Sequence, residues 1–165
     1  MKEANRKLLI EQSDRKFSYR VGALIYREGK ILVRRLREEG QYTLPGGHPE
    51  WGENSKAALA RRVQEETGAA VNVGRLCIVA ELFFEWEKPC HQIQFFYLAE
   101  LKNKDALPAG AFPVYDSLGQ PMEDLEFCWL LPEELEKCKL IPRCIRPYLK
   151  NLPDQIIHLQ DTEGK

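Results

Sequence analysis

Short runs of β-branched and aromatic residues dominate the pattern of apolar and polar positions along the chain. From Tyr19 to Tyr26 and from Ile31 to Val33 the residues are mostly apolar, and Glu28-Gly29-Lys30 separates the two runs. Because glycine permits a tight turn, this pattern predicts two strands joined in a β-hairpin. Further strands are predicted over residues 71–73, 76–84, 92–101 and 127–131, the second and third of these being joined around residues 85–91. Much of the fold should therefore be antiparallel sheet.

One amphipathic helix is predicted after the first strands. Asn54 or Ser55 can serve as its N-cap, and Gly68 supplies the stop signal. At about 100° per residue, one stripe of this helix is apolar and consists of Leu59, Ala60, Val63 and Thr67. Another face carries Arg62, Glu65 and Glu66. The helix thus buries one side and presents charged groups on another.

The remaining segments carry weaker patterns. Residues 1–17 predict a flexible arm or a short helix, and residues 103–120 predict a long irregular connection. Proline at position 132 opens a late helix, residues 141–152 show a second helical pattern, and residues 153–165 form a tail expected to fray. The order of elements predicts a single domain over residues 18–152, with a mixed-sheet α+β or α/β/α sandwich fold.

Composition narrows the class of protein. The 165 residues are 44% hydrophobic and 30% charged, which is typical of a globular domain and argues against a disordered or membrane-embedded chain. The 24 lysine and arginine residues and the 25 aspartate and glutamate residues give a formal net charge of 24 − 25 = −1. Neither nucleic acid nor a membrane is therefore an expected partner. The start lacks the apolar core of a signal peptide, and five cysteines without a C-x-x-C pair indicate reduced thiols, so a cytoplasmic location is expected.

Candidate chemistry lies at a glycine-rich loop and in the helix that follows it. The loop, residues 44–49, reads Leu-Pro-Gly-Gly-His-Pro, and the helix places Glu65 next to Glu66. Paired carboxylates are hard oxygen ligands that suit Mg²⁺ or Mn²⁺, ions that commonly reach substrate phosphates. An adjacent glutamate pair can also do no more than solvate a helix face. The loop beside the helix favours a diphosphate site.

These residues resemble the box of the Nudix (MutT-like) hydrolase family, G-x5-E-x7-R-E-U-x-E-E-x-G-U, in which U is a bulky aliphatic residue. The chain matches it without a gap at Gly47, Glu53, Arg61, Val63, Glu65, Glu66 and Gly68, with the small apolar Ala69 in the last place. The resemblance covers roughly residues 18–150. It implies an α/β/α sandwich with a mixed sheet, and hydrolysis, dependent on Mg²⁺ (or Mn²⁺), of a nucleoside diphosphate linked to another group. A nucleoside triphosphate, a nucleotide sugar and ADP-ribose are examples of this small-molecule partner, and the family's habit of dimerising leaves a homodimer open.

The resemblance also implies roles for particular residues. Glu65 and Glu66 would be catalytic metal ligands, and the third catalytic residue, Glu53, would support the site by pairing with Arg61 or by an outer-shell contact. Substrate would be bound by the loop and by nearby cationic or aromatic groups, namely Gly46, Gly47, His48, Trp51, and Arg35 together with its neighbour Arg34. Arg62, which departs from the family pattern, is a further substrate-binding candidate because of its own charge.

One residue departs from the family pattern. The glutamate that follows the box arginine is replaced by Arg62, which cannot act as a general base and can pair with Glu65 or Glu66 in competition with a metal ion. A carboxylate outside the box could take over, and the candidates are Glu50, Glu123 and Glu126. The alternative is a catalytically weakened or inactive nucleotide-binding or sensor protein, in which Arg62 binds a substrate phosphate directly. An adaptor without any ligand is a third hypothesis.

Overall fold

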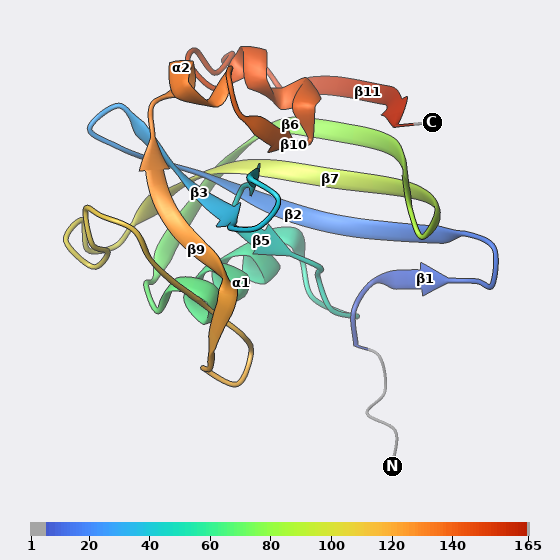
Figure 1. The fold of residues 1–165 in the computed structure, drawn as a ribbon, viewed down its shortest axis with the longest axis horizontal. Coiled ribbons are helices and arrows are strands. Elements are labelled where there is room, and N and C mark those ends of the chain that lie inside the picture. Colours follow the sequence, from blue (N-terminus) through green and yellow to red (C-terminus); the bar gives the residue numbers. More distant parts are fainter. Residues whose placement is uncertain (1–5, 165) are drawn as a thin grey trace.

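The computed structural model describes residues 6–164 and shows a mixed β-sheet between helices (Figure 1). In chain order the elements are β1 (Leu9–Glu11), β2 (Lys16–Arg27), β3 (Lys30–Leu36), β4 (Gln41–Thr43), β5 (Gly46–Gly47), α1 (Ser55–Thr67), β6 (Val71–Trp86), β7 (Lys88–Leu101), β8 (Phe112–Tyr115), β9 (Pro121–Leu130), α2 (Pro132–Leu135), β10 (Lys139–Ile141), the 3-10 helix η1 (Arg143–Tyr148) and β11 (Ile157–Gly164). No helix among these residues has the length and apolar character needed to cross a membrane.

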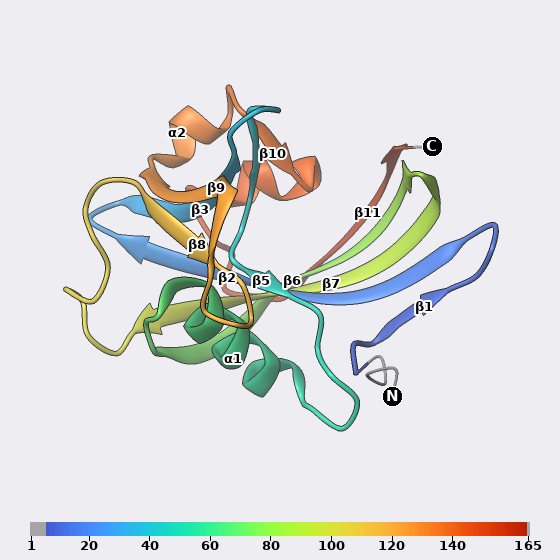
Figure 2. The ribbon, with the colours of Figure 1, turned by 60° about the horizontal axis from the view of Figure 1, so that its bottom comes forward.

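Strand β2 is the centre of the sheet. The strand order is β10-β4-β3-β2-β7-β6-β11, and β2 also pairs with β1 and β5. The predicted hairpin is confirmed, since β2 and β3 pair antiparallel with Tyr26 opposite Ile31. Strand β7 runs parallel to β2 and antiparallel to β6. Figure 2 shows β2, β7, β6 and β11 side by side as one curved sheet.

Alternate residues of β2 supply two separate cores. Val21, Ala23 and Ile25 belong to a buried cluster that includes Leu59 and Val63 of α1. Leu24, between them in the chain, belongs to a second cluster with residues of α2 and η1. Because successive side chains of a strand point to opposite faces, the helices cover both sides of the sheet, α1 on one and α2 on the other (Figures 1 and 2). The predicted α/β/α sandwich with a mixed sheet is confirmed.

Both ends of the chain differ from the sequence-based expectation. Residues 1–5 of the predicted arm lie outside the described residues, but residues 9–11 form strand β1 and pair with β2, with Leu9 opposite Ser18. The predicted frayed tail is wrong over β11, which pairs parallel with β6, His158 lying opposite Val79. The N–H and C=O groups at the edge of a sheet can form hydrogen bonds with a short polar segment. Such a segment has no apolar pattern of its own, so the sequence did not predict β1 or β11.

Two internal predictions also need correction. The stretch predicted to be irregular contains β8, which pairs with β9 and buries Phe112 against Phe127, their ring centroids 5.3 Å apart. The helical pattern predicted over residues 141–152 is a 3-10 helix limited to η1, preceded by β10, which pairs parallel with β4. Proline 147 inside this segment has no N–H for an α-helical hydrogen bond, which favours the shorter element.

Candidate active site

The loop and α1 meet at the two-residue strand β5. Gly46 and Gly47 pair with Gly22 and Val21 of β2. A side chain at Gly46 would place its Cβ 2.0 Å from the carbonyl oxygen of Val21, so only glycine lets the two backbones approach this closely. The loop is thereby fixed to the central strand.

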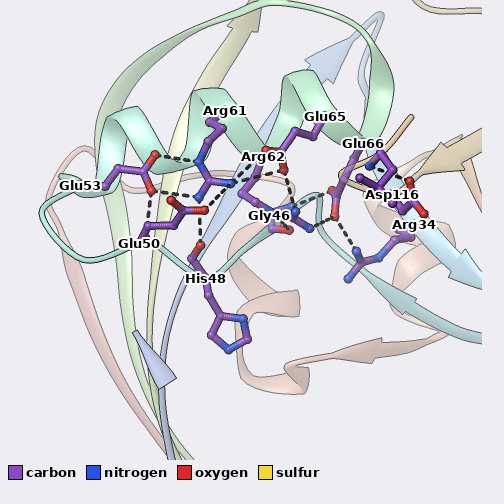
Figure 3. Close-up of polar contacts among 11 residues, drawn as sticks. Arg34, Gly46, His48, Glu50, Glu53, Arg61, Arg62, Glu65, Glu66 and Asp116 are labelled. Atoms are coloured by element: carbon purple, nitrogen blue, oxygen red, sulfur yellow. Dashed lines mark hydrogen bonds and ion pairs between the residues drawn. The ribbon is translucent and has the colours of Figure 1, made fainter. Parts of the chain in front are cut away.

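Local capping defines the limits of α1 as predicted. The side chain of Asn54 accepts a hydrogen bond from the Ala57 N–H at 2.9 Å, so Asn54 is the N-cap. Gly68 ends the helix in the left-handed conformation, with φ of 77°. The apolar stripe is buried in the core, and the charged face of α1 therefore turns towards β5 (Figure 3).

Arg61 organises the first part of the charged face. Its Nε and Nη2 donate to the two carboxylate oxygens of Glu53 at 2.8 and 2.9 Å, as the resemblance implied, and its Nη1 donates to Glu65 at 3.2 Å. This guanidinium lowers the pKa of Glu53, and hydrogen bonding to Glu53 raises the pKa of Arg61. The box glutamate is held as an ion rather than as an acid.

Glu66 is the most enclosed carboxylate of the site, with 2% of its surface exposed. Its Oε1 accepts from Arg34 and from Arg62, each at 2.9 Å, and its Oε2 accepts from the backbone N–H of Gly46 at 3.2 Å. Figure 3 shows these groups converging on Glu66 from α1, β3 and the loop. Burying a carboxylate is costly unless it is paired and hydrogen-bonded, and these three donors meet that requirement.

Arg62 bridges the two glutamates that the sequence assigns to a metal ion. It donates to Glu65 at 2.8 Å and to Glu66 at 2.9 Å, and its Nε lies 3.4 Å from the carbonyl oxygen of Gly46. Among residues 6–164, no three His, Cys, Asp or Glu side chains are grouped so that they could hold a metal. In this arrangement the site does not fit a divalent ion, because the guanidinium takes the oxygens that would bind it.

Arg20 on β2 is a member of the site that the sequence analysis did not name. Burial, followed by the nearby charge of Arg34, lowers its pKa to about 10, while the carboxylate of Glu66 opposes the shift and Arg62 adds to it. A charged residue between Tyr19 and Val21, in a run that is otherwise apolar from Tyr19 to Tyr26, was the signal that could have identified it. Glu66 therefore pairs with two guanidinium groups, those of Arg34 and Arg62, and interacts electrostatically with a third, that of Arg20.

His48 and Trp51 both lie on the loop before α1, and their side chains differ in burial. The carbonyl oxygen of His48 accepts from Arg61 at 3.3 Å, while its imidazole points away from α1 (Figure 3). Burial, and then the charge of Arg20, lowers the pKa of His48 to about 3. Its Nε2 is buried and has no hydrogen-bond partner in the described part of the chain. Trp51 is 71% exposed, so a stacking role for it stays a prediction.

The candidate site residues outside the box differ in whether they contact it. Arg35 forms an ion pair with Glu126, and Arg37 also contacts Glu126, at 3.1 Å. Arg34, the neighbour of Arg35, is the residue that reaches Glu66 of the box. Glu123 is exposed on β9. Of the three candidate replacement carboxylates, Glu50 is the one with a recorded contact to the box, 3.9 Å from Arg61 Nη1.

Comparison with known proteins agrees with this geometry. The model of the NUDIX domain matches residues 16–152. A curated "MutT-like protein" of Streptomyces ambofaciens is 38% identical over 55 residues, which are 33% of this chain and 36% of the relative, so the match spans about a third of that protein.

Solved structures share the fold. A crystal structure of a NUDIX hydrolase from Nitrosomonas europaea superposes with a TM-score of 0.61 at 24% identity, covering 87% of this chain and 77% of that one. An ADP-ribose pyrophosphatase from Streptococcus suis gives a TM-score of 0.57 at 17% identity, covering 87% and 98%. With the family model matching most of the chain, and with the box residues gathered at one site, the chain belongs to the NUDIX domain family.

Proposed function

We propose that the protein is a pyrophosphohydrolase that cleaves a nucleoside diphosphate linked to another group, such as a nucleoside triphosphate, a nucleotide sugar or ADP-ribose. The observation that carries this proposal is the junction of the Gly46–Gly47 strand with the charged face of α1. There Glu53, Arg61 and Glu65 form one network, which Arg62 connects to Glu66. Family membership supports the reaction class, and a structural relative described as an ADP-ribose pyrophosphatase supports the kind of substrate.

The cationic groups supply the binding chemistry. Arg34 and Arg62 both pair with the buried Glu66, and the charge of Arg20 acts on the same carboxylate. Guanidinium groups bind phosphate oxygens in a two-point geometry and stabilise negative charge that develops on them during phosphoryl transfer. In this proposal they hold the diphosphate and neutralise its developing charge.

Glu50 is the carboxylate that we assign to water activation. It is partly exposed, with 36% of its side-chain surface accessible, and it lies beside Arg61 without the close ion pair that holds Glu53. A base must be free to take a proton, and Glu53 and Glu66 are both engaged with guanidinium groups. Attack of water on a phosphorus would break the phosphoanhydride bond and release two phosphorylated products.

A nucleotide-binding protein with weakened chemistry is the second candidate function, and the bridge from Arg62 to Glu65 and Glu66 favours it specifically. The family generally uses divalent metals, and the donor set described above does not fit one. Such a protein would bind a nucleoside diphosphate derivative and release it unchanged.

The deciding experiment measures phosphate or nucleotide release from a panel of nucleoside triphosphates, nucleotide sugars and ADP-ribose, with Mg²⁺, with Mn²⁺ and with EDTA. Wild type is compared with Glu50→Gln, Glu66→Gln and Arg62→Glu, with Lys56→Gln on the exposed part of α1 as the matched control. Turnover by wild type and Lys56→Gln that falls at least about a hundredfold in Glu50→Gln supports the proposal. Activity confined to Arg62→Glu, with nucleotide still bound by wild type, supports the binding protein instead.

A further inference from the structure

Three oxygen atoms, from Gly46, Glu65 and Glu66, surround the guanidinium of Arg62 and form what we call the oxygen cage. Each of the three guanidinium nitrogens donates to a different residue. Nε faces the Gly46 carbonyl at 3.4 Å, Nη1 faces Glu65 Oε2 at 2.8 Å, and Nη2 faces Glu66 Oε1 at 2.9 Å. A single cationic group thus joins the loop to both glutamates (Figure 3).

The oxygen cage contains the kinds of ligand atom that bind divalent cations in proteins. Carboxylate and backbone carbonyl oxygens are the ligands that Mg²⁺ and Mn²⁺ prefer. Here the same oxygens are satisfied by a side chain of the protein itself. We propose that the guanidinium of Arg62 is the resident cation of this site, so that the wild-type protein binds a diphosphate group without a divalent metal ion. The diphosphate part of this inference rests on the proposed function.

Packing holds the guanidinium in place. A Cβ added to Gly47 would lie 2.4 Å from Arg62 Nε, so the arginine side chain lies directly against the glycine backbone. Its most buried partner, Glu66, is fixed independently by Arg34 and by the Gly46 N–H. A metal ion entering the cage would have to displace Arg62 from all three oxygens, and each charge-assisted contact resists that displacement.

Both carboxylates of the site are already paired with guanidinium groups. Glu66 pairs with Arg34 and Arg62, and Glu65 pairs with Arg61 and Arg62. A divalent cation would have to compete with these ion pairs for the carboxylate oxygens. The site therefore presents guanidinium groups, which suit phosphate oxygens, rather than unpaired carboxylates.

The first test measures the binding of Mn²⁺ alone, from the electron paramagnetic resonance signal of the free ion. Arg62→Gln removes the guanidinium and keeps both carboxylates, so we expect it to bind Mn²⁺ at least about tenfold more tightly than wild type. Adding Glu66→Gln to Arg62→Gln should abolish that gain. Lys56→Gln removes one positive charge from the same helix away from the cage and should match wild type within about twofold. A wild-type affinity equal to that of Arg62→Gln, and sensitive to Glu66→Gln, overturns the proposal.

The second test can be decided with wild type alone, so its outcome holds even if a variant fails to fold. Calorimetry with inorganic pyrophosphate in EDTA should show binding, and Arg62→Gln should weaken it at least about tenfold. Binding that wild type shows only after Mg²⁺ is added, or no binding in EDTA, overturns the resident-cation proposal. Neither result depends on turnover, so a failure of the hydrolase proposal is recognised separately by bound but uncleaved nucleotide.

Discussion

Arg61 and Glu53 form a two-point ion pair in which Nε and Nη2 of the arginine donate to the two carboxylate oxygens at 2.8 and 2.9 Å. The pair connects the middle of α1 to the loop before it, and the second oxygen of Glu53 also accepts from the Glu50 N–H. One glutamate therefore fixes both the helix and the loop that carries Glu50.

We expect Glu53→Gln to lower the free energy of unfolding by about 1–3 kcal/mol, because it leaves the partly buried Arg61 with a neutral partner. Urea denaturation measures the change. Asp14→Asn, which breaks the exposed ion pair of Asp14 with Arg15, is the control and should leave the midpoint unchanged. Equal effects of the two substitutions would contradict a structural role for the Glu53 pair.

The same pair predicts a pH dependence. The pKa of Glu53 is lowered in the folded protein by Arg61, so its stabilising contribution is present above the ordinary glutamate pKa of about 4.3 and is lost as the pH falls through the lowered folded value. The stability difference between wild type and Glu53→Gln should therefore be constant near neutral pH and shrink on acidification. Urea midpoints measured from pH 7 downwards test this, and a constant difference at every pH would argue against it.

His48 predicts a second acid-sensitive contribution over a different range. Its pKa falls to about 3, mainly because of burial, whereas an unfolded histidine titrates near about 6.5. Between these values the unfolded chain binds a proton that the folded chain does not, so stability should decrease as the pH is lowered from 6.5 towards 3. His48→Gln should flatten this slope in urea unfolding, and parallel curves for the two proteins would sink the assignment.

Gly46→Ala should damage the site through the backbone. Its φ of 150° and the approach of the Val21 carbonyl leave no room for a Cβ, so we expect a loss of stability of about 1–3 kcal/mol together with weaker nucleotide binding. Gly110→Ala is the matched control, because an added Cβ there meets nothing within 4 Å and the φ is not positive. Thermal unfolding and nucleotide titration measure both variants, and near-identical behaviour would contradict the close approach of β5 to β2.

Strand β11 predicts protection at the end of the chain. Its backbone pairs with β6 from Ile157 to Asp161, so these amides should exchange with deuterium more slowly than those of an unpaired segment. Hydrogen exchange followed by mass spectrometry measures this. Exchange of residues 157–161 at the rate of a free peptide would contradict the pairing of β11 and support the frayed tail predicted from the sequence.

Local patterns in the sequence determined the elements whose signals lie within a few residues. The hairpin turn, the Asn54 and Gly68 caps and the apolar stripe of α1 all follow from neighbouring residues, as does the reach of Arg61 to Glu65 four positions later. The resemblance to the family box implied either a pair of Glu53 with Arg61 or an outer-shell contact, and the two side chains form the pair. Helical periodicity and turn chemistry are short-range properties, so a sequence can report them directly.

Tertiary structure decided the features that join distant segments. Arg34, rather than Arg35, reaches Glu66 across 32 positions, and Arg20 enters the site from the central strand. Strand β11 forms only because β6 offers a pairing partner far away in the chain. The sequence showed that Arg62 could compete for Glu65 and Glu66, but the third contact, to the Gly46 carbonyl, depends on the pairing of β5 with β2. Such arrangements depend on non-local contacts, which no spacing along the chain encodes by itself.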